Sequence, residues 1–116
     1  MIRVRAVLNG AGCLASVSVT GHAATSDRGS SVSVVCAAVT AVVRSCADAI
    51  ARRASVRATG ATTGPGDFRL ELDADSAGEW LHGVTDVLLT GIGRIAGEAP
   101  LEVELTIERE EQRNGT

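Results

Sequence analysis

The first twenty residues alternate between apolar and polar side chains, the pattern of strands that bury one face. In residues 2–8, Ile, Val, Ala and Leu occupy the even-numbered positions, and arginines occupy positions 3 and 5. Residues 14–20 resume the alternation. Between them, Gly10-Ala11-Gly12 has the composition of a turn. The segment therefore predicts a hairpin of two strands.

Similar alternation returns later in the chain. Residues 55–61 and 68–73 alternate on either side of Gly64-Pro65-Gly66, which predicts a second hairpin. Near the C-terminus, residues 101–108 alternate aliphatic side chains with glutamates and a threonine, and they predict a final strand.

Two segments have helical rather than strand periodicity. Apolar residues recur at helical spacing over residues 34–53, and Ser33 is placed to cap the first turn of that helix. A second helix is predicted after Ser76, which forms a capping-box pattern with Glu79, and it should end near Gly97.

The resulting order, ββαββαβ, predicts an α+β fold in which two helices pack on a mostly antiparallel, five-stranded sheet. The pairing of the strands stays open at this point. Residues 1–109 are expected to form a single domain, and residues 110–116 a frayed tail.

Composition narrows the functional classes. The chain has 116 residues, of which 45% are hydrophobic, and a net charge of −3. Its aromatic residues are only Phe68 and Trp80. Single-stranded nucleic acids are usually bound by stacking on aromatic side chains, and phosphate backbones call for a basic surface. We therefore expect no direct nucleic-acid partner.

The cysteines indicate a reducing compartment. Cys13, Cys36 and Cys46 are odd in number and show no CxxC spacing, so neither a disulfide framework nor a zinc site is expected. The first residues lack the apolar core of an export signal. The longest apolar run, residues 34–43, ends at Arg44 and is too short to cross a bilayer. A soluble, cytoplasmic protein without metal or cofactor is expected.

Residues 21–40 carry the strongest chemical signal. His22 follows a strand, a small-residue loop covers residues 22–32, and Cys36 is the third residue of the predicted helix. A helix start favours a thiolate, and its amides can hold an oxyanion. A nearby histidine would act as base and acid. In the alternative interpretation, Cys36 is a small buried hydrophobe and His22 a structural hydrogen-bonding residue.

Other candidates for chemistry carry less signal. Cys46 lies near the apolar stripe of its helix and is expected to be a buried hydrophobe. Cys13, beside the first turn, suggests only an exposed thiol, and His82 is expected at the surface or half-buried. The residues 22–32 are either a lid over a bound peptide or a connector, and both interpretations stay open.

Two motifs together resemble the ribosomal-processing cysteine proteases, the Prp family. They are Gly-His-Ala at 21–23 and, after the polar loop, Val-Cys-Ala-Ala-Val-Thr at 35–40. The order of elements also matches along nearly the whole chain, including the FRLEL segment at 68–72. The resemblance implies a bacterial homodimer with a Cys–His dyad. Its implied role is to remove the N-terminal extension of a large-subunit ribosomal protein.

Carried over residue by residue, the resemblance makes Cys36 the nucleophile and His22 the base. Thr40 stands where the family often has serine, and it keeps the hydroxyl. Ser33 stands where an acidic residue is usual, so Asp27, the only carboxylate of the loop, is the candidate substitute for orienting the histidine. Gly21, which precedes the histidine, is grouped with these residues as part of the substrate-binding or orienting set.

Two rival functions remain. One is a ribosome-associated or regulatory binding module of the same fold that has lost catalysis, which the serine at position 33 favours. The other is a thiol redox or metal-handling protein that uses Cys13, Cys36 and His22. The glutamates of the last strand and tail are expected to form a solvated face, or to speed encounters with a basic ribosomal protein. They are Glu102, Glu104, Glu108, Glu110 and Glu111.

Overall fold

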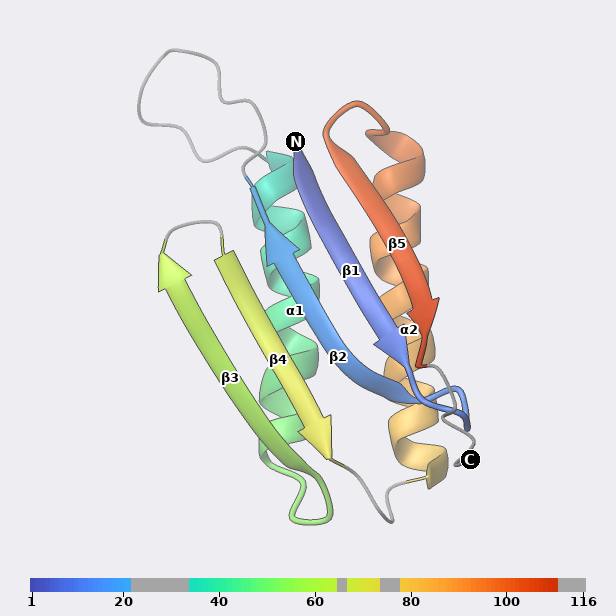
Figure 1. Ribbon diagram of the computed structural model, residues 1–116. Coiled ribbons are helices and arrows are strands. Elements are labelled where there is room, and N and C mark those ends of the chain that lie inside the picture. The colour runs from blue at the N-terminus through green and yellow to red at the C-terminus, as the bar shows by residue number, and fades with distance from the viewer. Residues whose placement is uncertain (22–33, 65–66, 74–77, 111–116) are drawn as a thin grey trace.

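A computed structural model of the protein describes residues 1–21, 34–64, 67–73 and 78–110. Its elements in chain order are β1 (Ile2–Leu8), β2 (Leu14–Thr20), α1 (Val34–Ala51), β3 (Arg57–Gly64), β4 (Asp67–Asp73), α2 (Gly78–Glu98) and β5 (Val103–Arg109). The five strands form one sheet, and both helices lie side by side on one face of it (Figure 1). The predicted α+β fold with the order ββαββαβ is confirmed.

The strands are arranged in the order β3-β4-β2-β1-β5. Both predicted hairpins are present as antiparallel pairs, β1 with β2 and β3 with β4. The two hairpins join through β2 and β4, which are also antiparallel. The one parallel pair of this sheet is β1 with β5, in which Ile2 is opposite Val103. The sheet is therefore mostly antiparallel, as predicted.

Several element ends differ from the prediction for local reasons. Helix α1 ends at Ala51 because the next residues tighten into a turn, in which the Arg53 amide donates to the Ile50 carbonyl at 3.0 Å. Strand β5 begins at Val103 rather than at residue 101 because a turn precedes it. In this turn the Glu102 amide donates a hydrogen bond to the Ala99 carbonyl at 3.0 Å.

The core lies between the helices and the sheet. The apolar side chains at the even positions of β1 are buried along the whole strand, with exposed fractions from 0% to 7%. It packs against a buried stripe on each helix, listed here for α1 and then α2: Val39, Val43, Ile50; Leu81, Leu88, Ile92. The strand alternation predicted this division because successive side chains of a strand point to opposite faces.

Helix α1 is apolar over its full length, with a mean hydropathy of 1.8 over 18 residues. Length and composition alone would let such a helix cross a membrane, a criterion that the core helix of a soluble protein also meets. The prediction that this segment is too short to cross a bilayer considered only the apolar run of residues 34–43, whereas the helix continues past Arg44 to Ala51. In the structure, α1 packs its buried side chains against the sheet.

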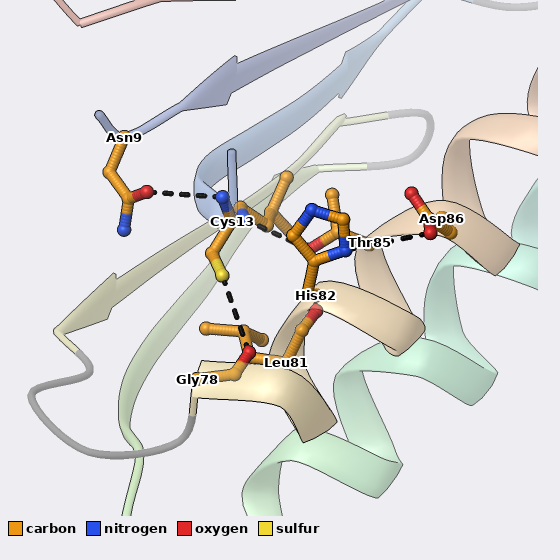
Figure 2. A network of polar contacts seen from close by, with 8 residues as sticks. Asn9, Cys13, Gly78, Leu81, His82, Thr85 and Asp86 are labelled. Carbon is orange, nitrogen blue, oxygen red and sulfur yellow. Dashed lines mark hydrogen bonds and ion pairs between the residues drawn. The ribbon is translucent and has the colours of Figure 1, made fainter. Parts of the chain in front are cut away.

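A polar network joins the β1–β2 turn to α2 (Figure 2). The Asn9 side-chain oxygen accepts hydrogen bonds from the amides of Ala11 and Cys13, at 2.9 and 3.0 Å. The next amide, that of Leu14, donates to Thr85 Oγ1 at 2.9 Å, and this hydroxyl donates to the Leu81 carbonyl at 2.7 Å. The turn is thus anchored to the first turns of α2.

Candidate active site

Cys36 lies in the first turn of α1, where it is the third helical residue, as predicted. It is half-buried and lines a pocket of about 210 Å³ between α1 and one end of the sheet. The first amides of a helix have no partner within the helix, and the helix dipole is positive there. A thiol in this position has a cavity beside it for a substrate and hydrogen-bond donors at the helix start.

The pocket is lined by both apolar and polar residues. Its apolar lining comes from β1, β2, β4 and α1: Ile2, Val19, Phe68, Val39 and Val43. The wall also contains four exposed polar residues: Thr40, Arg44, Thr62 and Asp67. The Arg44 guanidinium lies over the Phe68 ring, 5.5 Å from its centroid. The cavity therefore fits an apolar side chain with a polar opening beside it.

Gly21 directly follows β2 and also lines the pocket. Its φ is +87°, in the left-handed region that favours glycine. A Cβ at this position would overlap the backbone carbonyl of Met1. Gly21 is therefore required here for two separate reasons, and it is the residue that immediately precedes His22 in the chain.

The structure thus brings three of the predicted site residues, Cys36, Thr40 and Gly21, to one pocket. Thr40 lies one helical turn beyond the cysteine and is exposed on the pocket wall. The other three, His22, Asp27 and Ser33, lie outside the described residues, as do the loop 22–32 and the capping serine of the second helix.

The other two thiols lie elsewhere. Cys46 is half-buried, and burial raises the pKa of its thiol, which agrees with the expected hydrophobic role. The expected exposure of Cys13 is wrong, because this residue is only 5% exposed. Helix α2 covers it, and its thiol donates to the Gly78 carbonyl at 3.6 Å (Figure 2).

This arrangement disfavours the redox and metal-handling rival. Cys13 precedes β2 and Gly21 follows it, so the seven residues of this strand, about 23 Å in length, separate Cys13 from the pocket of Cys36. A disulfide needs Cα atoms within about 7 Å. Among the described residues, no group of three or more His, Cys, Asp or Glu is placed to hold a metal ion.

His82 is also remote from the pocket. It lies beside the β1–β2 turn, at the opposite end of β2 from Gly21, and its Nδ1 is 3.5 Å from Asp86 one helical turn away (Figure 2). The ring is about half exposed, as expected. It has no contact with Cys36, and it serves as a surface residue.

The glutamates of β5 form ion pairs with β1 on the open face of the sheet. Arg3 is 3.4 Å from Glu104, and Arg5 is 2.6 Å from Glu108. These two carboxylates are partly neutralised, so the interpretation as a solvated face is favoured over a role in attracting a basic partner.

Sequence reasoning did not identify Phe68 and Arg44 as site residues. Phe68 belongs to β4, and Val19, its partner in the register, belongs to β2. The pairing of the two hairpins brings the ring to the pocket, and no local pattern signals that pairing.

Known structures share this fold. A ribosomal processing protease Prp from S. aureus, in complex with a covalently linked product peptide, matches with a TM-score of 0.78 and 24% identity, over 93% of this chain and 100% of that chain. The same protease with a substrate peptide matches with a TM-score of 0.75 and 23% identity, again over 93% and 100%. SMU.848 from Streptococcus mutans gives a TM-score of 0.76 and 24% identity, over 95% and 96%.

No curated protein sequence matches the chain. The family model described as cysteine protease Prp, however, matches residues 1–104, nearly the whole chain. The match covers every element of the sheet up to the first residues of β5, together with the helix that carries Cys36 and the pocket beside it. The chain therefore belongs to the cysteine protease Prp family, and it is a cysteine peptidase.

Proposed function

We propose that this protein is a cysteine endopeptidase that removes the N-terminal extension of a large-subunit ribosomal protein, with Cys36 and His22 as its catalytic dyad. The observation that carries the proposal is the position of Cys36. It lies in the first turn of α1 and opens onto a pocket that also contains Gly21, the residue before His22. The ribosomal substrate is supported by family membership and by the S. aureus proteases of this fold, which are described as ribosomal processing enzymes.

In the proposed mechanism, the Cys36 thiolate attacks a peptide carbonyl carbon and forms a C–S bond. Backbone amides at the start of α1 donate hydrogen bonds to the oxyanion of the tetrahedral intermediate. The C–N bond then breaks, and the imidazolium of His22 gives its proton to the departing amine. Water, deprotonated by the same imidazole, attacks the thioester and returns Cys36 as a thiol.

Thr40, Ser33 and Asp27 have supporting roles in this proposal. Thr40 shapes the pocket wall one turn beyond the nucleophile. Ser33 caps α1 in place of the family's acidic residue, and Asp27 orients His22. We further propose that the enzyme acts as a homodimer in the bacterial cytoplasm, on a protein substrate rather than on nucleic acid.

The test uses the N-terminally extended ribosomal protein from the same genome, incubated with the wild type and with Cys36→Ala, His22→Ala and Cys46→Ala. Products are identified by intact mass. We expect loss of one defined N-terminal peptide with the wild type and Cys46→Ala, and no product with the other two. Cys46→Ala is the matched control, because it removes a thiol from the same helix, away from the pocket.

Cleavage by Cys36→Ala would contradict the mechanism. If the folded, reduced wild type also left the substrate intact, the catalytically inactive binding module would be favoured, and Ser33→Asp would test whether the missing acidic residue is the cause.

A further inference from the structure

The pocket beside Cys36 is elongated along α1. Cys36 and Arg44 both line it, and they are two helical turns apart, about 12 Å along the helix axis. An extended peptide advances about 3.3 Å per residue. If the peptide carbonyl lies at the thiol, a residue about four positions away is level with the far end of the pocket, so the side chain that enters this end lies within about four residues of the scissile bond.

The Phe68 ring forms the wall at this far end. It comes from β4 and is partly buried, packed against the core beside Val19, its partner on β2. Among the described residues that line the pocket, Phe68 is the only aromatic one, and it has the largest of the apolar side chains. The volume left for a substrate side chain consequently depends on this ring more than on the neighbouring valines.

Arg44 limits the movement of that ring. Its guanidinium lies over the ring, 5.5 Å from the centroid, a geometry in which the cation and the ring attract each other. Arg44 is itself exposed at the pocket wall, and no ion pair with another described residue competes for it. The two residues belong to α1 and β4, so their contact also ties the helix to the sheet at the far end of the pocket.

We propose that Phe68, held in place by Arg44, is the residue that sets the size of the apolar side chain accepted by this protease at one position near the scissile bond. The inference rests on the proposed cysteine peptidase activity and adds to it a determinant of specificity. Phe68 forms the end of the subsite, and Arg44 is a positioning residue that acts through the ring.

The test is a peptide series built on the cleaved sequence, in which each position within about four residues of the scissile bond is varied in turn among Val, Leu, Phe and Trp. We expect the wild type to show a size preference at one position. Phe68→Ala removes the whole ring and should shift kcat/KM at that position toward the larger side chains by at least about tenfold, since a single methylene in an apolar pocket already changes it by about that factor. Phe68→Trp should shift it toward the smaller ones.

Matched controls separate the subsite from general destabilisation. Leu72→Ala truncates another partly buried residue of β4 that does not line the pocket, and it should leave the ratios of kcat/KM unchanged. Arg44→Met should broaden the size preference at the same position. Arg53→Met should not, although it removes an equivalent contact, that of Arg53 over the Trp80 ring at 4.5 Å. Phe68→Leu replaces Phe68→Ala if the alanine variant does not fold, and a smaller shift in the same direction is then expected.

The outcomes distinguish this inference from the proposed function. If the wild type cleaves in a Cys36-dependent manner but the preferences of the Phe68 variants equal those of the wild type, the inference is wrong and the peptidase stands. If the wild type cleaves no peptide or protein substrate, the proposed function itself fails. Equal shifts in Phe68→Ala and Leu72→Ala would assign the effect to loosened packing and would overturn the role of the ring.

Discussion

Gly21 lies against the backbone carbonyl of Met1, so closely that even one added carbon at Gly21 would overlap it. The first residue of the chain is thereby packed against the residue that precedes the proposed base. Ile2 continues this contact into the pocket wall, and its amide donates to the Glu102 carbonyl at 2.8 Å. Met1 and Ile2 are therefore structural parts of the candidate active site.

This contact predicts that Gly21→Ala strongly lowers both the stability of the protein and its peptidase activity. The left-handed backbone costs an alanine about 1–2 kcal/mol, and the overlap with Met1 adds to that cost. Gly12→Ala is the matched control, since Gly12 has a similar φ of +85°, but its added carbon would lie 3.4 Å from the His82 ring. Urea unfolding should show a clearly larger loss for Gly21→Ala, and only this variant should lose peptidase activity. Equal losses of stability would mean that Met1 does not restrict position 21.

The hydrogen bonds of Thr85 predict that its substitution changes the stability of the fold. Its buried hydroxyl accepts the hydrogen bond of the Leu14 amide, which lies next to the bulge between β1 and β2. Thr85→Val leaves that amide without its acceptor and should lower the free energy of unfolding by about 1–3 kcal/mol. Thr85→Ser should retain most of the stability, and Thr90→Val, at an exposed position of the same helix, should change it by less than about 0.5 kcal/mol. A Thr85→Val protein as stable as the wild type would show that the amide finds another partner.

The Cys46 thiol provides a test at alkaline pH. Burial raises the pKa of this thiol, so the folded protein favours its protonated form. The stability contributed by Cys46 is present below the unfolded thiol pKa of about 8.5 and is lost as the pH rises through the folded value. Alkylation of Cys46, followed by peptide mass spectrometry, should therefore need a higher pH in the native protein than in urea. Superimposable pH profiles in the two states would contradict the burial effect.

The pair of Arg5 and Glu108 predicts a pH effect of the opposite sign. The hydrogen bond from Arg5 lowers the pKa of the Glu108 carboxyl and raises the pKa of the guanidinium. Its stabilising effect is present above the unfolded glutamate pKa of about 4.3 and is lost as the pH falls through the lowered value. An NMR titration of the carboxyl carbon should show the lowered pKa in the wild type. The titration should return to the ordinary value in Arg5→Gln, and added salt should weaken the shift because both groups are exposed.

Local periodicity predicted much of the fold. The alternation of residues 14–20 matched β2 at both ends, and the helical spacing from residue 34 matched the first residue of α1. Both signals depend on which face of one element is apolar, so they can be recognised without knowing its neighbours. The same reasoning placed Cys36 in the first turn of α1, the feature on which the proposed nucleophile depends.

The neighbours of each element were decided only by the tertiary structure. The periodicity of residues 103–109 does not distinguish pairing with β1 from pairing with β3, yet β5 lies parallel to β1 because α2 carries the chain back along the sheet. Cys13 is buried because α2 covers it, although a cysteine beside a glycine turn carries no local sign of burial. Phe68 and Arg44 reach the pocket of Cys36 because β4 pairs with β2 under α1. Sequence alone determined the elements and the candidate nucleophile, whereas packing between distant segments determined the shape of the pocket, since a pocket is formed by contacts that no single segment contains.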